Sequence, residues 1–244
     1  TDDGTCWVNL GDSYYNYRPG KGQGLPKQSV SNTKQDLPDV CPRRGNRIEG
    51  LKEKDLIGIP WLFAFAMRAD GWYLRQDIIW HKPNPMPESV RDRCTKSHEY
   101  IFLFSKNKKY YYDNEAIKEP AKDWGTRDRT NGKYHNKGTG LQPHSGLTKS
   151  YPTKNKRSVW SVTNKPYKGA HFAVFPPELI EPCIKAGSEK GDIILDPFMG
   201  SGTTGMVAKQ LGRDYIGCEL NEEYGKLIQK RVTDYKVSIM DIID

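Results

Sequence analysis

The chain has 244 residues, of which 36% are hydrophobic and 28% are charged, which is ordinary for one large globular domain. No stretch approaches the roughly 18 consecutive apolar residues of a membrane span, so we expect neither a membrane association nor a secretory leader. Five scattered cysteines without a C-x-x-C pair argue against a zinc site and a disulfide framework, and we predict no metal and a reducing compartment.

The positive charge is concentrated in one segment. The formal net charge is +8, yet the segment Ser105–Ala170 alone holds 15 basic and 5 acidic residues. A local basic excess interleaved with aromatic residues is typical of a surface that binds a polyanion. A solvated lysine-rich loop is the alternative.

The first half of the chain alternates short apolar runs with polar segments. A strand is expected at Thr5–Leu10, followed by a long loop, rich in Gly and Pro, at Tyr17–Gly50. Lys54–Arg75 predicts a helix that runs through about Met67 and ends near Gly71. Next come a strand interrupted by three prolines, Leu74–Pro87, and an aromatic strand with a basic turn, His98–Asp113.

The second half begins with a segment of little apolar periodicity, Lys118–Ala170, which predicts a loop-rich insertion with at most a small core of its own. Alternating helices and strands follow, with Pro at the start and Gly at the end of the first helix. The expected elements are a helix at Phe175–Gly187, a strand at Ile193–Leu195, a helix at about Thr203–Leu211, a strand at Tyr215–Cys218 and a helix from Glu222 to about Tyr235.

A glycine turn in this last region predicts a nucleotide-like ligand. A strand, a Gly-rich turn, a helix and a second strand form a βαβ unit. Gly200 and Gly202 permit close backbone approach, and the helix N-terminus offers free N–H groups. Glu219 follows the second strand, where a carboxylate can accept both hydrogen bonds of a ribose diol.

Three ligands and one structural role compete for this turn. A phosphate loop of the Walker type needs a lysine after the second glycine, and none is present. The nicotinamide spacing fits Gly200, Gly202 and Gly205, but Asp196 at the strand tip would repel a pyrophosphate. An acid there suits a cationic ligand, which favours the sulfonium and ammonium groups of S-adenosylmethionine. A turn that only packs and caps a helix would not need Asp-Pro-Phe before the glycines.

The segment "DPFMGSGTTGMVAKQLGRDYIGCELNEEY" resembles the cofactor motif of the amino-methylating DNA methyltransferases. The resemblance implies that the acid, the aromatic ring and the glycines line the cofactor and that Glu219 holds its ribose. The cofactor residues expected in this region are Asp196, Pro197, Phe198, Gly200, Ser201, Gly202, Thr203, Thr204, Glu219, Leu220 and Asn221.

The resemblance extends over most of the chain. "HFAVFPPELIEPCI" sits where such enzymes often carry His-Pro-Thr-Gln-Lys-Pro, so His171, Phe172 and Ala173 are further candidates for cofactor contact. "WHKPNPMPESVRDR" and "DGTCWVNLGDSYY" also resemble segments of this group, and their order matches its β class. The implied architecture is an α/β, Rossmann-like S-adenosylmethionine-dependent methyltransferase fold with circularly permuted motif order and a loop-rich basic insertion.

This order predicts three parts of the chain. Residues 1–112 would form the catalytic half of the methyltransferase domain, residues 113–170 a basic target-recognition insertion, and residues 171–244 the cofactor-binding half. S-adenosylmethionine is the expected cofactor.

The Asp/Ser/Asn-Pro-Pro-Tyr/Phe tetrapeptide of this family is absent from the 244 residues, and Asn84-Pro85-Met86-Pro87 is the nearest approach. In the family its strand lies in the middle of the sheet, before a segment like "DGTCWVNLGDSYY". Without that strand the sheet would be split. We therefore expect an upstream portion that carries two strands and the tetrapeptide. A short, catalytically inactive form is the alternative.

The resemblance predicts transfer of a methyl group to an exocyclic amine of a flipped base. Trp80, His81 and Asn84 are expected to line the base pocket, and Asp12, at the end of the first strand, to contact the cofactor or the base. The flanking segments resemble members with the serine form of the tetrapeptide, which favours cytosine N4. Adenine N6, an inactive DNA-binding relative and an RNA methyltransferase are the alternatives.

Double-stranded DNA is the expected partner, with a cognate restriction nuclease as a second one. A cytoplasmic or nucleoid-associated location (nuclear in a eukaryote) follows, and the oligomeric state, monomer or homodimer, stays open. Basic residues of the insertion would neutralise phosphates, and those of the Tyr17–Gly50 loop would close over the DNA. The expected DNA-binding residues are Arg43, Arg44, Arg127, Arg129, Lys133, Lys154, Lys156 and Arg157.

Overall fold

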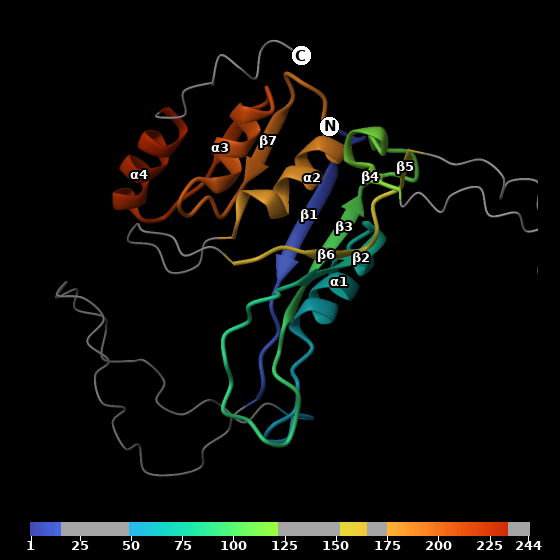
Figure 1. Ribbon diagram of the computed structural model, residues 1–244, viewed down its shortest axis with the longest axis vertical. Helices are drawn as coiled ribbons and strands as arrows, with labels where there is room; N and C mark the ends of the chain where they lie inside the picture. The colour runs from blue at the N-terminus through green and yellow to red at the C-terminus, as the bar shows by residue number, and fades with distance from the viewer. Residues whose placement is uncertain (16–48, 122–151, 165–174, 234–244) are drawn as a thin grey trace, which may run out of the picture.

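The computed structural model describes residues 1–15, 49–121, 152–164 and 175–233 (Figure 1). Within these residues the chain forms a four-stranded sheet, a separate parallel pair of strands and a short two-stranded ribbon. Helices pack on the sheet and on the parallel pair, which gives the predicted α/β architecture. No helix of this part of the chain is long and apolar enough to cross a membrane.

The four-stranded sheet has the order β1-β3-β2-β6. β1 (Thr5–Leu10) and β2 (Tyr73–His81) both pair antiparallel with β3 (His98–Ser105), and β6 (Val159–Ser161) pairs parallel with β2. β1, β2 and β6 therefore run in the same direction. Their carboxyl ends and the amino end of β3 meet at one edge of the sheet.

The two faces of this sheet are covered by different helices. Phe102 and Phe104 of β3 pack with Ala64 of α1 (Ile59–Ala69) on one face. Ile101, which points the other way because strand side chains alternate, packs with Leu179 of α2 (Pro177–Gly187). The aromatic and β-branched residues of the predicted strand thus serve two cores at once.

α2 joins the sheet to the second half of the chain (Figure 1). Its residue Ile184 packs with Val207 and Ala208 of α3 (Thr203–Gln210). α3 lies on the parallel pair of β7 (Ile193–Asp196) and β8 (Asp214–Gly217), and α4 (Glu222–Thr233) follows β8. This is the βαβ unit that the glycine turn predicted.

The helix predicted from Lys54 begins later, at Ile59. Gly58 has a φ of 81°, a left-handed conformation that a helix cannot include, and Pro60 occupies the first turn. The first turn is capped by Asp12, whose carboxylate accepts hydrogen bonds from the backbone N–H groups of Gly58 and Ile59 at 3.0 Å each. The cap comes from a residue far away in the chain, so a local pattern could not locate it.

Part of the segment expected as a loop-rich insertion belongs to the main sheet. After a single 3-10 turn (Glu115–Ile117), β4 (Glu119–Pro120) and β5 (Thr153–Lys154) form a short antiparallel ribbon. β6 then runs beside β2, and its Trp160 is buried against Trp80 and Leu179. The division at residues 113 and 170 stays a prediction.

The parallel pair of strands shows one uncovered face. Ile194 of β7 and Tyr215 of β8 pack toward α3, whereas Ile193, Leu195 and Ile216 are exposed. Among the described residues no hydrogen-bonded strand connects this pair to the four-stranded sheet. The β7–β8 pair and the four-stranded sheet are therefore separate within the described residues, and the expected upstream strand stays a prediction.

Candidate active site

A pocket of about 510 Å³ lies at the glycine turn between β7 and α3. This volume is within the usual range for small-molecule sites. The segment after β8 and Phe175, two residues before α2, complete its wall. The lining residues are Phe175, Pro197, Phe198, Met199, Gly200, Ser201, Thr203, Cys218, Glu219 and Leu220.

Glu219 is fixed to the glycine turn by its carboxylate. Oε2 accepts a hydrogen bond from the backbone N–H of Gly200 at 2.8 Å, and Oε1 accepts one from the N–H of Asn221 at 3.0 Å. A carboxylate has about four lone-pair positions, so two remain for a ligand. The acid at the end of β8 is therefore held at the wall of the pocket with capacity to bind hydroxyl groups.

Asp196, the last residue of β7, organises the first part of the same turn. Its Oδ1 accepts a hydrogen bond from the N–H of Phe198 at 2.9 Å, and its Oδ2 accepts one from the hydroxyl of Thr204 in α3. These bonds place a negative charge at the strand tip beside the pocket. That charge disfavours an anionic ligand such as pyrophosphate and favours a cationic one.

The turn needs glycine at two positions. Gly200 and Gly202 have φ angles of 52° and 81°, which residues with a side chain rarely adopt. Gly202 also lies so close to α4 that an added Cβ would stand 3.2 Å from atoms of Ile228. Ser201 and Thr203, on either side of it, are buried. The turn is thus held rigidly between β7, β8 and α4.

Two apolar side chains at the pocket are left open to solvent. Phe198 is 88% exposed and Leu220 is fully exposed, although both line the pocket. Exposed apolar groups beside a carboxylate suit a flat, apolar ring that is attached to a hydroxylated sugar. Together with the charge of Asp196, the pocket fits the adenosine and sulfonium groups of S-adenosylmethionine.

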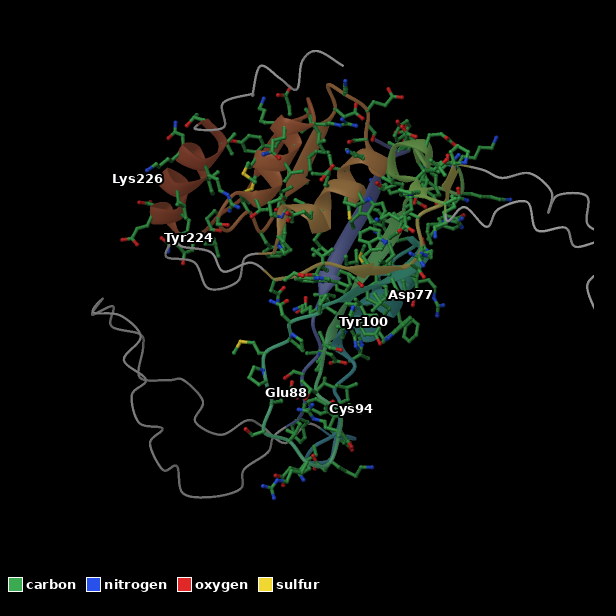
Figure 2. All side chains as sticks on the ribbon, viewed as in Figure 1. Asp77, Glu88, Cys94, Tyr100, Tyr224 and Lys226 are labelled. Carbon is green, nitrogen blue, oxygen red and sulfur yellow. The ribbon has the colours of Figure 1, made fainter. Side chains whose placement is uncertain are left out.

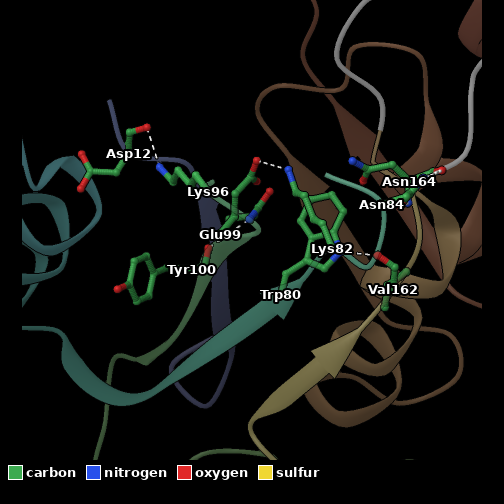
Figure 3. A network of polar contacts seen from close by, with 10 residues as sticks. Asp12, Trp80, Lys82, Asn84, Lys96, Glu99, Tyr100, Val162 and Asn164 are labelled. Carbon is green, nitrogen blue, oxygen red and sulfur yellow. Dashed lines mark hydrogen bonds and ion pairs between the residues drawn. The ribbon is translucent and has the colours of Figure 1, made fainter. Parts of the chain in front are cut away.

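A second group of predicted residues lies at the edge where β1, β2 and β6 end (Figure 3). Trp80 is buried and donates its indole N–H to the carbonyl of Val162 at 2.9 Å. The ammonium group of Lys82 lies 4.2 Å from the centre of the Trp80 ring and is paired with Glu99 of β3. Trp80 is thereby fixed on both its edge and its face.

Asp12 lies at the same edge, and Lys96 donates a hydrogen bond to its backbone carbonyl at 2.6 Å (Figure 3). Its carboxylate caps α1, as described above, and also accepts from the N–H of Ser13. These bonds give the carboxylate a role in the fold, and its predicted contact with cofactor or base stays a prediction.

Asn84 and His81 connect this edge to the chain that follows β6. The Asn84 side chain donates to the carbonyl of Asn164 and accepts from the Asn164 N–H, both at 3.1 Å. His81 Nδ1 lies 3.1 Å from the hydroxyl of Ser161. The structure therefore brings Trp80, His81 and Asn84 together, and it engages the Asn84 amide with the backbone.

The basic residues at the base of the predicted insertion are partly paired. Glu119 interacts with Arg157 at 3.1 Å and with Lys156 at 3.8 Å, and Lys156 also lies over the ring of Trp160. Burial acts to raise the pKa of Glu119, but the hydrogen bond and charge of Arg157 and the charge of Lys156 outweigh it and lower the pKa. Lys154 pairs with Glu119 in the β4–β5 ladder.

Several predicted residues lie outside the described part of the chain. These are Arg43, Arg44, Arg127, Arg129, Lys133, His171, Phe172 and Ala173. Sequence reasoning missed Phe175, Met199 and Cys218 as pocket residues. Met199 could have been found, because it stands between two predicted neighbours, Phe198 and Gly200.

The cysteines differ sharply in environment. Cys94 and Cys218 are exposed, whereas burial raises the pKa of the Cys183 thiol to about 12. Cys94 lies on the loop between β2 and β3, far from α4 and its residues Tyr224 and Lys226 (Figure 2). Only one exposed cysteine of the described residues therefore lines the pocket.

Comparison with known proteins identifies the family. The family model for DNA methylases matches residues 1–230. The chain belongs to the DNA methylase family. It is 48% identical to the type II methyltransferase M.SmaI of Serratia marcescens, over 95% of this chain and 68% of that protein. It is 45% identical to the type II methyltransferase M.XycI of Xanthomonas campestris pv. cyanopsidis, over 99% and 69% of the two chains.

Solved structures of methylases have the same fold. The PvuII DNA methyltransferase, described as cytosine-N4-specific, matches with a TM-score of 0.59 and 18% identity over 99% of this chain and 68% of that one. TTHA0409 of Thermus thermophilus, a putative DNA modification methylase complexed with S-adenosylmethionine, matches with a TM-score of 0.54 and 20% identity over 95% and 70%. The Rossmann-like methyltransferase fold and the amino-methylating DNA methyltransferase family predicted from the sequence are confirmed. The DNA methylase is an enzyme that acts on DNA.

Proposed function

We propose that this DNA methylase transfers a methyl group from S-adenosylmethionine to the N4 amino group of cytosine in duplex DNA. S-adenosylmethionine is the methyl donor of the family. The pocket in which Glu219 is hydrogen-bonded to Gly200, below the exposed Phe198 and Leu220, is the observation that carries the proposal. It offers a carboxylate for a ribose and apolar groups for an adenine within one wall.

Three residues that line the pocket, and Asp196 beside it, then have defined tasks. The free lone pairs of Glu219 accept the ribose hydroxyl hydrogens, and Phe198 and Leu220 pack on the adenine and exclude water from it. Asp196 stabilises the positive charge of the methionine part through its position at the tip of β7. The bound donor supplies an already activated methyl group, so the contribution of the protein is to orient it toward the amine.

The carboxyl edge of the four-stranded sheet, where β1, β2 and β6 end, holds the base. Trp80, which is buried in the core and fixed by Val162 and Lys82, supports this edge from within, and Asn84 and His81 tie the edge to the chain after β6. The side-chain amide of Asn84 is already hydrogen-bonded to the backbone of Asn164. In this proposal Asn84 therefore acts on the base indirectly, by fixing the position of that backbone. The exocyclic amine forms the new N–C bond, the carbon–sulfur bond breaks, and the amine loses one proton to solvent.

Cytosine N4 is favoured over adenine N6 by two segments. "WVNLGDSYY" and "WHKPNPMPESVRDR" resemble members with a serine in the catalytic tetrapeptide, a form associated with cytosine N4. Since the 244 residues contain no such tetrapeptide, the target base is inferred from these two segments. Adenine N6 is the second candidate. The remaining partners in the proposal are a restriction nuclease of the same sequence specificity and chromosomal DNA at the nucleoid.

The test is transfer of a radiolabelled methyl group from S-adenosylmethionine to duplex DNA by the protein expressed from its whole gene. The DNA is then digested to nucleosides and separated. Label in N4-methylcytosine is the expected result, and label in N6-methyladenine would move the proposal to the second candidate. Transfer to RNA in preference to DNA, or no transfer with saturating donor, would contradict it.

A further inference from the structure

A partly buried polar contact links the last helix to the glycine turn. Arg231, in the final turns of α4, donates from Nη1 to the hydroxyl of Ser201 at 2.7 Å and to the hydroxyl of Thr203 at 3.1 Å. The same nitrogen lies 3.3 Å from the carbonyl of Ser201. Both acceptors line the cofactor pocket and are almost fully buried, with exposures of 3% and 2%.

The hydrogen bonds from Arg231 to the two hydroxyls are stronger than those between neutral groups. A guanidinium donor is charged, and hydrogen bonds from charged donors are shorter and stronger than those between neutral groups. The two hydroxyls lie 3.4 Å apart and converge on one nitrogen. A single side chain therefore fixes the rotamers of both residues that flank Gly202.

The turn is thus held from two sides. Glu219, at the end of β8, binds the N–H of Gly200, while α4 closes the opposite side through Arg231 and through the close contact between Gly202 and Ile228. Because a left-handed glycine between two buried hydroxyl residues has other accessible conformations, an external contact is needed to select one of them. Arg231 supplies that contact without lining the pocket itself.

We propose that Arg231 is a positioning residue for the cofactor, which sets the conformation of the glycine turn through Ser201 and Thr203. This inference rests on the proposed function, since it takes the pocket to be the S-adenosylmethionine site. Because Thr203 is the first residue of α3, a guanidinium held there also keeps the first turn of α3 in place before a ligand arrives. Preorganisation of this kind raises affinity because less ordering is needed on binding.

The experiment is isothermal titration calorimetry of S-adenosylmethionine into the chain and its variants. Arg231→Gln is expected to raise the Kd at least tenfold, and Arg231→Lys, which keeps one charged donor, to recover part of that loss. Lys230→Gln, an exposed neighbour on the same helix, is the matched control and is expected to stay within twofold of the wild type.

A double-mutant cycle separates positioning from a general effect on stability. If Arg231 acts through Ser201, then Arg231→Gln combined with Ser201→Ala binds no more weakly than the weaker single variant. Losses that multiply would overturn the proposed route. A lower Tm for Arg231→Gln with an unchanged Kd would also overturn it, since the residue would then only hold α4.

Three further outcomes have separate meanings. Should Arg231→Gln fail to fold, Arg231→Lys decides the question, and a Kd at least threefold above the wild type supports the inference while an unchanged Kd contradicts it. If the wild type bound no S-adenosylmethionine, the proposed function would fall, and this inference with it. Equal, tight binding by the wild type and Arg231→Gln would contradict the role of Arg231 but leave the proposed function standing.

Discussion

The carboxylate of Glu219 and the backbone N–H of Gly200 are 2.8 Å apart, although 19 residues separate them in the chain. This hydrogen bond joins the segment after β8 to the turn after β7, so Glu219 and Gly200 form one wall of the pocket. Any ligand that binds to the acid is thereby placed against the turn. The bond also makes the acid sensitive to substitution.

Glu219→Gln is expected to weaken cofactor binding about tenfold or more. The amide leaves one oxygen where the carboxylate has two, so either the Gly200 bond or the ribose contact is lost, and a bond to a charged acceptor is worth about 1.5–3 kcal/mol. Calorimetry with S-adenosylmethionine measures the effect. Glu222→Gln, an exposed acid in the first turn of α4, is the control, and equal losses in both variants would refute a specific role for Glu219.

Gly202 and Gly225 are expected to respond in opposite ways to substitution by alanine. Gly202→Ala forces a side chain into a φ of 81° and to within 3.2 Å of Ile228, so unfolding free energy should fall by about 2–4 kcal/mol. Gly225, in α4, has open space around it, so Gly225→Ala should raise it by about 0.5–1 kcal/mol. Urea unfolding measures both values, and a neutral Gly202→Ala would contradict the described turn.

The contact between Asn84 and Asn164 predicts that alanine has different effects on kcat at these two positions. Asn84→Ala removes both hydrogen bonds to the backbone of residue 164, at about 1 kcal/mol each, and is expected to lower kcat about tenfold while leaving the cofactor Kd unchanged. Asn164→Ala keeps its backbone groups and therefore both bonds. Similar kcat values for the two variants would show that the tie does not serve the reaction.

Lys156 and Arg157 are both predicted DNA contacts, but their surroundings differ. The Arg157 side chain is 72% exposed and that of Lys156 is 21% exposed. If Arg157 meets a phosphate, Arg157→Ala should reduce the slope of log K against log salt by about 0.9, whereas Lys156→Ala should change it less. DNA binding measured over a series of salt concentrations tests this. A larger change for Lys156→Ala would reverse the assignment.

Features of this structure were predictable from the sequence when the residues that determine them lie close together in the chain. The strand, turn and helix around Asp196 and Gly200 were predictable because their signals are adjacent. β6 was missed because three residues are too short for a recognisable pattern, and only pairing with β2 makes them a strand.

The same reason accounts for the site residues that were missed. Arg231 reaches Ser201 across 30 residues, and the Asn84 amide meets a backbone 80 residues later. A local sequence pattern does not predict such contacts, because they depend on how α4 and β6 pack in the folded chain. The start of α1 was shifted for a related reason, because its cap, Asp12, lies at the end of β1.

Protection of Cys218 by S-adenosylmethionine is the sharpest test of cofactor binding at the glycine turn. Cys218 is exposed and lines the pocket, Cys94 is exposed and lies on the loop between β2 and β3, and Cys183 is buried with a raised pKa. Iodoacetamide labelling followed by mass spectrometry should modify Cys94 and Cys218 and leave Cys183 unmodified. Saturating S-adenosylmethionine should then slow modification of Cys218 at least tenfold without changing that of Cys94. Equal labelling of Cys218 with and without the cofactor would contradict binding at this turn.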